Sequence, residues 1–85
     1  MKEIKHVLTD PLGIHARPAG LLIRMAGKFK CDIQIGSTAK MVNAKRIIGV
    51  MALTLKQGDE VTLTFNGEDE EEAAAEIGQF LAENL

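Results

Sequence analysis

The chain has 85 residues, a 46% hydrophobic fraction and a formal net charge of −2, which together indicate a single folded domain spanning residues 1–85. Its one cysteine excludes an internal disulfide and a multi-cysteine metal site. It contains neither tryptophan nor tyrosine, which argues against the aromatic stacking platforms of many single-strand binders.

The first predicted element is a half-buried strand over residues 2–8. Alternation places Ile4, His6 and Leu8 on one face of this strand. His6 is therefore interpreted as a structural or edge-facing residue rather than a ligand. Residues 10–13, DPLG, then predict a turn.

A helix is predicted from Ala16 to about Phe29, because apolar residues recur there at helical spacing. Pro18 is compatible with a helix only in its first turn, where backbone N–H groups lack intrahelical partners. The helix must therefore begin at or near His15.

The remaining elements are short and follow closely on one another. The pattern predicts a strand at 31–35, a turn at 36–38, a strand at 40–43, a small helix at 46–53, a turn at 57–59 and a strand at 61–65. A last helix is expected from Asp69, with Glu72 three residues later forming a variant of the capping box. Cys31 is interpreted as a small residue at the start of its strand.

The resulting order is β-α-β-β-α-β-α, which predicts the α+β class. Four strands of period two indicate a mainly antiparallel sheet. The helices are expected on one face of this sheet, with the other face open to water.

The segment GIHARPAG, residues 13–20, carries the clearest chemistry. Unpaired N–H groups and the helix dipole favour an anion at a helix N-terminus, phosphate above all. The guanidinium of Arg17 can grip phosphoryl oxygens with two parallel hydrogen bonds. This arrangement suits reversible phosphorylation of His15, although a histidine here can also be a plain cap or surface residue. The partners needed for metal binding or triad hydrolysis are missing from the segment.

The charge is unevenly distributed along the chain. Residues 1–56 hold all ten Lys and Arg and three acids, a net charge of +7, whereas residues 57–85 hold the other nine acids and no base, a net charge of −9. The basic part could attract an acidic or phosphorylated partner. A nucleic-acid-binding module is the alternative interpretation, but the scarcity of aromatic residues argues against it and no nucleic-acid partner is expected.

GIHARPA, residues 13–19, closely resembles the active-site motif of HPr, the histidine-containing phosphocarrier family of the bacterial phosphoenolpyruvate:sugar phosphotransferase system. VNAK at 42–45 followed by IIGVM at 47–51 is similar to the second signature of that family. The resemblance extends over essentially the whole chain and implies the family's open-faced β-sandwich, a four-stranded antiparallel sheet with three helices on one face.

The resemblance also implies a function and partners. Enzyme I would place a phosphoryl group on Nδ1 of His15, and the carrier would donate it to enzyme IIA domains. Arg17 and the backbone amides of Ala16 and Arg17 would hold the phosphoryl oxygens. Such a protein is a covalent carrier rather than a stand-alone enzyme, with no cofactor and no metal. We expect a cytoplasmic protein without membrane insertion, since neither a signal peptide nor a run of about 18 apolar residues is recognised. A monomer is expected as well.

A docking face for these partners is implied as well. It combines a basic rim with an apolar patch, as an interface for partners with acidic rims should. Its expected residues are Gly20, Arg24, Arg46, Ile47, Ile48 and Met51.

Position 46 departs from the family pattern. Many Gram-positive members carry a serine there that a regulatory kinase phosphorylates, whereas this chain has Arg46. Arg46 also replaces a good helix cap, for which Asn43 is the expected substitute. This departure motivates an alternative, a regulatory paralogue that is phosphorylated on His15 but signals instead of serving sugar uptake.

Overall fold

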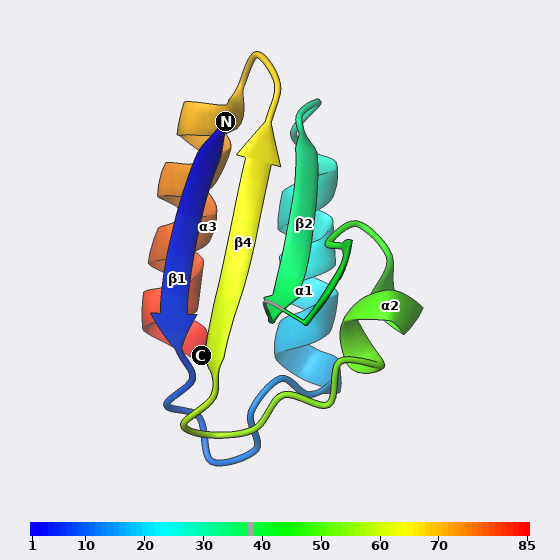
Figure 1. The fold of residues 1–85 in the computed structure, drawn as a ribbon, viewed down its shortest axis with the longest axis vertical. Helices are drawn as coiled ribbons and strands as arrows, with labels where there is room; N and C mark the ends of the chain where they lie inside the picture. The colour runs from blue at the N-terminus through cyan, green and yellow to red at the C-terminus, as the bar shows by residue number, and fades with distance from the viewer. Residues whose placement is uncertain (38) are drawn as a thin grey trace.

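The computed structural model describes residues 1–37 and 39–85. Its elements follow the predicted order (Figure 1). They are β1 (Lys2–Val7), α1 (Ala16–Gly27), β2 (Asp32–Ser37), β3 (Lys40–Asn43), α2 (Ile47–Met51), β4 (Glu60–Asn66) and α3 (Glu70–Asn84). The α+β class is confirmed.

The four strands form one antiparallel sheet in the order β1-β4-β2-β3. The last strand, β4, therefore lies inside the sheet, between β1 and β2. Leu63 of β4 is opposite Ile4 on one side and Ile35 on the other. This register places the apolar residues of the predicted alternation in one layer, as the period of two requires.

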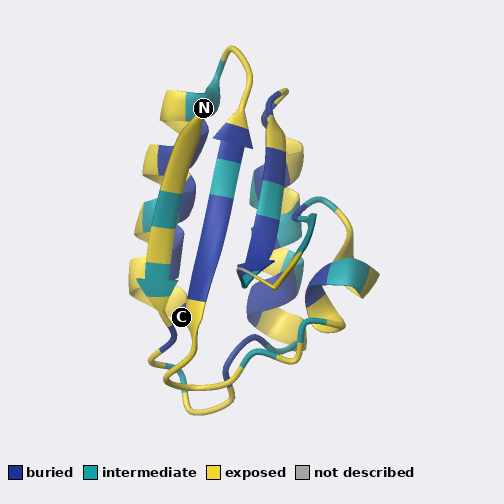
Figure 2. Ribbon diagram, viewed as in Figure 1, coloured by how far each residue is buried: buried dark blue, intermediate teal, exposed yellow. Residues whose placement is uncertain are grey.

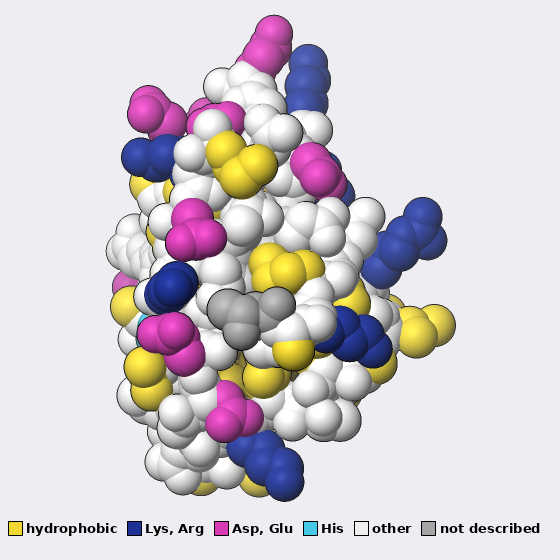
Figure 3. All heavy atoms as spheres, in the orientation of Figure 1, with side chains coloured by type: hydrophobic (Ala, Val, Ile, Leu, Met, Phe, Trp, Pro, Cys, Tyr) yellow, Lys and Arg dark blue, Asp and Glu magenta, His cyan; other side chains and the backbone are white. Residues whose placement is uncertain are grey.

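The helices cover one face of the sheet, and α1 and α3 lie along it in Figure 1 while α2 lies beside α1 and β3. The core lies between these layers, and burial is concentrated on the inner strands and on the helix faces turned to the sheet (Figure 2). Its fully buried side chains include Leu22, Leu63, Phe65, Ile77 and Leu81. Seen from the sheet side, the opposite face carries acidic, basic and hydrophobic side chains scattered among other side chains and backbone (Figure 3).

Some boundaries differ from the predicted ones. Strand β2 continues through Gly36 and Ser37, so the turn expected there was placed too early; Thr38 lies outside the described residues. Gly36 is paired with Met41, and a Cβ at Gly36 would overlap the Lys40 backbone. Glycine here therefore permits close strand pairing rather than a turn.

The start of α3 corrects a second expectation. Asp69 is the N-cap residue, but its side chain makes no capping bond and no capping box forms. Instead its two carboxylate oxygens accept hydrogen bonds from the N–H groups of Lys30 (2.8 Å) and Cys31 (2.9 Å). The bond from Lys30, followed by those from Cys31, lowers the pKa of the Asp69 carboxyl below its usual value. Asp69 therefore joins the α1–β2 connection to α3.

Candidate phosphoryl-transfer site

His15 is the N-cap residue of α1, in extended backbone with φ −128° and ψ 178°. Its carbonyl accepts the Ala19 N–H at 3.0 Å, but its imidazole makes no capping bond. Among the described residues, the N–H groups of Ala16 and Arg17 have no hydrogen-bond partner. The ring stands one-third exposed beside these amides, so the first turn presents free donors next to a nucleophilic side chain.

The proline at 18 fits this turn as expected. It is the third residue of α1, where its missing N–H removes no intrahelical bond. Pro18 is buried while Arg17 remains exposed. The buried Pro18 thus holds the backbone of this turn in place, while the Arg17 side chain is exposed to solvent.

The loop before α1 is held in place by Gly13. Its φ of +65° is in the left-handed region, and a Cβ there would overlap the Leu55 carbonyl oxygen and lie 2.7 Å from the Lys56 Cα. The next residue, Ile14, donates its N–H to that carbonyl oxygen at 3.2 Å. Glycine at 13 therefore lets the loop pack against residues 55–56 and sets the direction in which His15 leaves it.

A pocket of about 250 Å³ opens at His15. It is lined by Asp10, His15, Arg17, Pro18, Leu21 and Asn84. Asp10 Oδ2 lies 3.5 Å from His15 Nε2. The structure thus brings the two predicted residues His15 and Arg17 to one pocket.

Three other lining residues were not anticipated from the sequence. Asp10 was interpreted only as a turn residue, and Asn84 lies far away in the chain, so no local pattern joins either to His15. Leu21 is 44% exposed and off the buried stripe of α1. A leucine outside the apolar period was the signal that could have identified it.

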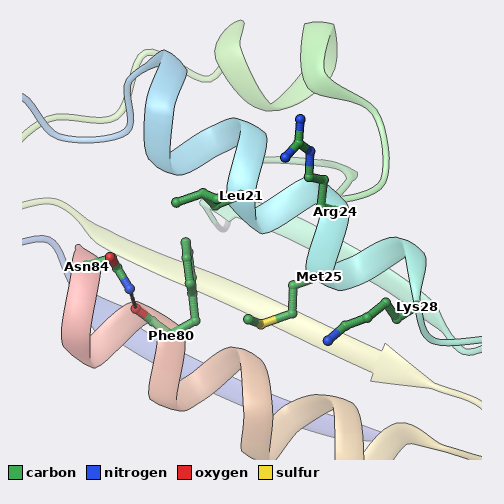
Figure 4. Close-up of a pocket in the computed structure, with 6 residues that line it drawn as sticks. All are labelled: Leu21, Arg24, Met25, Lys28, Phe80 and Asn84. Atoms are coloured by element: carbon green, nitrogen blue, oxygen red, sulfur yellow. Dashed lines mark hydrogen bonds between the residues drawn. The ribbon is translucent and has the colours of Figure 1, made fainter.

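A second hollow of about 410 Å³ adjoins this pocket between α1 and α3. Figure 4 shows Leu21 and Phe80 reaching toward each other from the two helices, with Arg24 and Lys28 further along α1. Asn84 donates its side-chain N–H to the Phe80 carbonyl oxygen at 3.1 Å. Since Leu21 and Asn84 line both hollows, the surface around His15 continues into this groove.

The residues expected for docking are at the surface of α1 and α2. Ile48 is 83% exposed, and Ile47 and Met51 are 45% and 37% exposed. The two helices contact each other, so these side chains and those of α1 form neighbouring parts of one surface. Arg24 and Arg46 are exposed and Gly20 is half-buried.

Asn43 does not cap α2 as expected. Its side-chain oxygen accepts the Lys45 N–H at 2.9 Å, which closes the turn before the helix. Arg46 is the N-cap residue and makes no side-chain capping bond. With only five residues, α2 depends on packing, and the buried Val50 supplies it.

Within residues 1–37 and 39–85, no group of three or more His, Cys, Asp or Glu side chains could hold a metal ion. No helix of that part is long and apolar enough to cross a membrane.

Comparison with known proteins identifies the family. Residues 2–83 match the family described as the phosphotransferase-system HPr component phosphorylation site. The chain belongs to the HPr family. Among its relatives are phosphocarrier proteins HPr from Lysinibacillus sphaericus, 45% identical with 98% of this chain and 94% of the relative covered, and from Mycoplasma genitalium, 41% identical with 99% and 97% covered.

The solved structures agree with this assignment. An HPr from Thermoanaerobacter tengcongensis has a TM-score of 0.91 and 40% identity, with 96% of this chain and 92% of that chain covered. An HPr dimer from the same organism is also similar, with a TM-score of 0.77 and 40% identity over 98% of this chain and 95% of that one. HPr-family membership makes this chain a phosphocarrier of the phosphotransferase system.

The regulatory alternative gains no support from these comparisons. A swapped dimer of Crh, a catabolite repression protein of Bacillus subtilis, has a TM-score of 0.78 and 40% identity over 88% of this chain and 86% of that one. The curated HPr relatives above, however, carry the phosphocarrier name. Transport chemistry is thus the function that the family assignment supports.

Proposed function

We propose that this HPr-family protein accepts a phosphoryl group from enzyme I on Nδ1 of His15 and donates it to enzyme IIA domains. The observation that carries the proposal is the first turn of α1. There, a partly exposed imidazole stands beside Arg17 and beside two backbone N–H groups that have no partner in the described part of the chain. A phosphoryl group on the ring meets hydrogen-bond donors and positive charge without a further covalent bond.

The transfer balances as a displacement at phosphorus. The Nδ1 lone pair attacks, the bond from phosphorus to the donor group breaks, and its electron pair stays with the donor. The amides of Ala16 and Arg17 and the Arg17 guanidinium hold the phosphoryl oxygens throughout. Because these contacts stabilise the group without trapping it, the same steps run in reverse toward an enzyme IIA domain.

We assign partner docking to the exposed surface of α1 and α2 around His15. Arg24 and Arg46 supply its positive charge, and the 83% exposed Ile48 supplies an apolar anchor. A partner with acidic side chains around an apolar centre is complementary to this surface. Leu21, 44% exposed between His15 and the groove, extends the apolar part toward α3.

The working form that we propose is a cytoplasmic monomer. A monomer leaves the helices of both docking elements accessible to each partner in turn, as a carrier between two proteins requires. Light scattering at micromolar concentration tests it directly, and a mass of two chains would replace the monomer with a dimer such as the one known from Thermoanaerobacter tengcongensis.

The experiment for the proposed function is intact-mass spectrometry after incubation with enzyme I and phosphoenolpyruvate. The wild-type chain gains one acid-labile phosphoryl group. His15→Ala prevents the gain, whereas His6→Ala, at the only other histidine, preserves it. A wild-type chain that gains no mass, or a His15→Ala chain that still does, overturns the assignment.

A further inference from the structure

Asp10 is held more firmly than an exposed turn residue requires. Its N–H donates to the Leu85 carbonyl oxygen at 3.2 Å, and its carbonyl oxygen accepts the Gly13 N–H at 2.8 Å. Its side-chain Oδ1 accepts the Leu12 N–H at 2.8 Å. These three bonds fix the backbone and one carboxylate oxygen, so the direction of Oδ2 is fixed as well.

The remaining oxygen faces the imidazole. Oδ2 of Asp10 lies 3.5 Å from Nε2 of His15, with the two side chains about one-quarter and one-third exposed. A carboxylate accepts hydrogen bonds and cannot donate them, so it favours the ring form that carries its proton on Nε2. In that form Nδ1 has a free lone pair, and Nδ1 has no hydrogen-bond partner among the described residues.

We propose that Asp10 is a positioning residue that selects the Nε2–H tautomer of His15 and so makes Nδ1 the nucleophile; this inference rests on the proposed function. During transfer the Nδ1–P bond forms, the bond from phosphorus to the donor breaks, and the Nε2 proton stays between the ring and Asp10. The phosphorylated ring then carries a positive charge that the Asp10 carboxylate stabilises from the side opposite the phosphoryl group.

Two substitutions of Asp10 separate its bond to Leu12 N–H from its effect on the imidazole ring. In Asp10→Asn, the side-chain carbonyl keeps the bond from Leu12 N–H, which turns the NH₂ group toward Nε2. An NH₂ group donates, so this variant favours the opposite tautomer, with the proton on Nδ1 and the nucleophile blocked. Asp10→Ser keeps an acceptor for Leu12 N–H but does not reach the ring, and it reports the tautomer equilibrium of the ring itself.

The test is the tautomer of His15 measured by ¹⁵N NMR of the imidazole nitrogens in the full chain, followed by the rate of phosphorylation by enzyme I. We expect the Nε2–H signature in wild type, a shift toward Nδ1–H in Asp10→Asn, and an intermediate state in Asp10→Ser. The phosphorylation rate should fall about tenfold in Asp10→Asn and less in Asp10→Ser, because the carboxylate 3.5 Å from Nε2 then no longer favours the reactive tautomer or the positive charge of the phosphorylated ring.

Each outcome decides the role of Asp10 separately from that of His15. The same tautomer in all three proteins, with unchanged rates, overturns the positioning role while wild-type phosphorylation on His15 still stands. A slower Asp10→Asn whose tautomer matches wild type also rejects it, because the loss then comes from docking or loop structure. A wild-type chain that is not phosphorylated at all rejects the proposed function instead, whatever the tautomers are.

Discussion

The N-termini of α1 and α3 make opposite use of the same helix geometry. Neither N-cap side chain, His15 or Asp69, makes a capping bond. The first turn of α3 nevertheless carries three glutamates, residues 70–72, whereas the first turn of α1 carries no acid. Glu70 accepts the Gly67 N–H at 3.0 Å and pairs with the Met1 amino group at 3.0 Å.

The start of α3 thus has a structural role, whereas the start of α1 is the candidate site for chemistry. Acids at the α3 end neutralise the helix dipole and link neighbouring segments, which stabilises the fold. The α1 end has Arg17 in their place, and two amides that lack partners among residues 1–37 and 39–85; under the proposed function, the positive potential there acts on the phosphoryl group. The first turn of α1 itself carries no carboxylate, and the Asp10 carboxylate lies on the Nε2 side of the His15 ring.

An acidic residue placed in the first turn of α1, as in α3, should produce the largest change in the phosphorylation rate. In Ala16→Glu, the exposed residue after His15 becomes an anion beside the phosphoryl group. Repulsion between them should slow phosphorylation about 30- to 100-fold. The rate of phosphoryl uptake from enzyme I measures it.

Ala16→Gln is the matched control, since it has the same size without the charge. It should retain most of the wild-type rate. An equal loss in Gln and Glu variants would show that bulk at position 16, rather than charge, obstructs docking.

A comparably large effect is expected on the reactivity of the Cys31 thiol, because Cys31 contacts Asp69 at the start of α3. Burial, and next the hydrogen bond to Asp69, raises the pKa of the Cys31 thiol from 9.0 to about 11. Near neutral pH its thiolate fraction is then about a hundredfold lower than that of an ordinary thiol, so alkylation by iodoacetamide is slow. Rapid alkylation in folded protein, at the rate seen in denaturant, would contradict this.

The fold was largely predictable because it depends on local periodicity. The position of Pro18 predicted the start of α1. The strand pattern at 2–8 and the turn at 57–59 helped to predict the order of the elements. The contacts of Asp69 and Asp10 were not predictable, because their partners depend on tertiary approach: Lys30 and Cys31 for Asp69, and the ring of His15 for Asp10.

For the candidate site, the sequence could point only to residues that are neighbours in the chain. His15 and Arg17 are two residues apart, so a local motif identifies both of them. Leu21 and Asn84 come together only when α3 packs beside α1. No spacing in the sequence reveals that contact.

Replacing Arg17 tests how much its guanidinium group contributes at the start of α1. Arg17→Lys retains the charge but loses the planar fork that binds two oxygens at once. The phosphorylation rate should fall about tenfold, the cost of one charge-assisted hydrogen bond. An unchanged rate would mean that Arg17 contributes charge alone.

The smallest effect concerns acid stability through Asp69. Its folded-state pKa lies below the ordinary value of 3.8, so the stabilisation is fully present above about pH 4 and is lost as the pH falls through the folded-state pKa. Asp69→Asn should have a lower denaturant midpoint at neutral pH and a flatter decline in acid. Glu72→Gln, at an exposed acid of the same turn, should keep the wild-type dependence of stability on pH. Identical pH profiles for the two variants would show that Asp69 does not stabilise the fold in this way.

One measurement tests the contrast between the two helix starts most directly, namely the backbone ¹H–¹⁵N shifts before and after phosphorylation of the protein. We expect the largest amide shifts at Ala16 and Arg17, with the amides of Asp69 and Glu70 unchanged. Small shifts at Ala16 and Arg17, with larger ones at the start of α3, would contradict it.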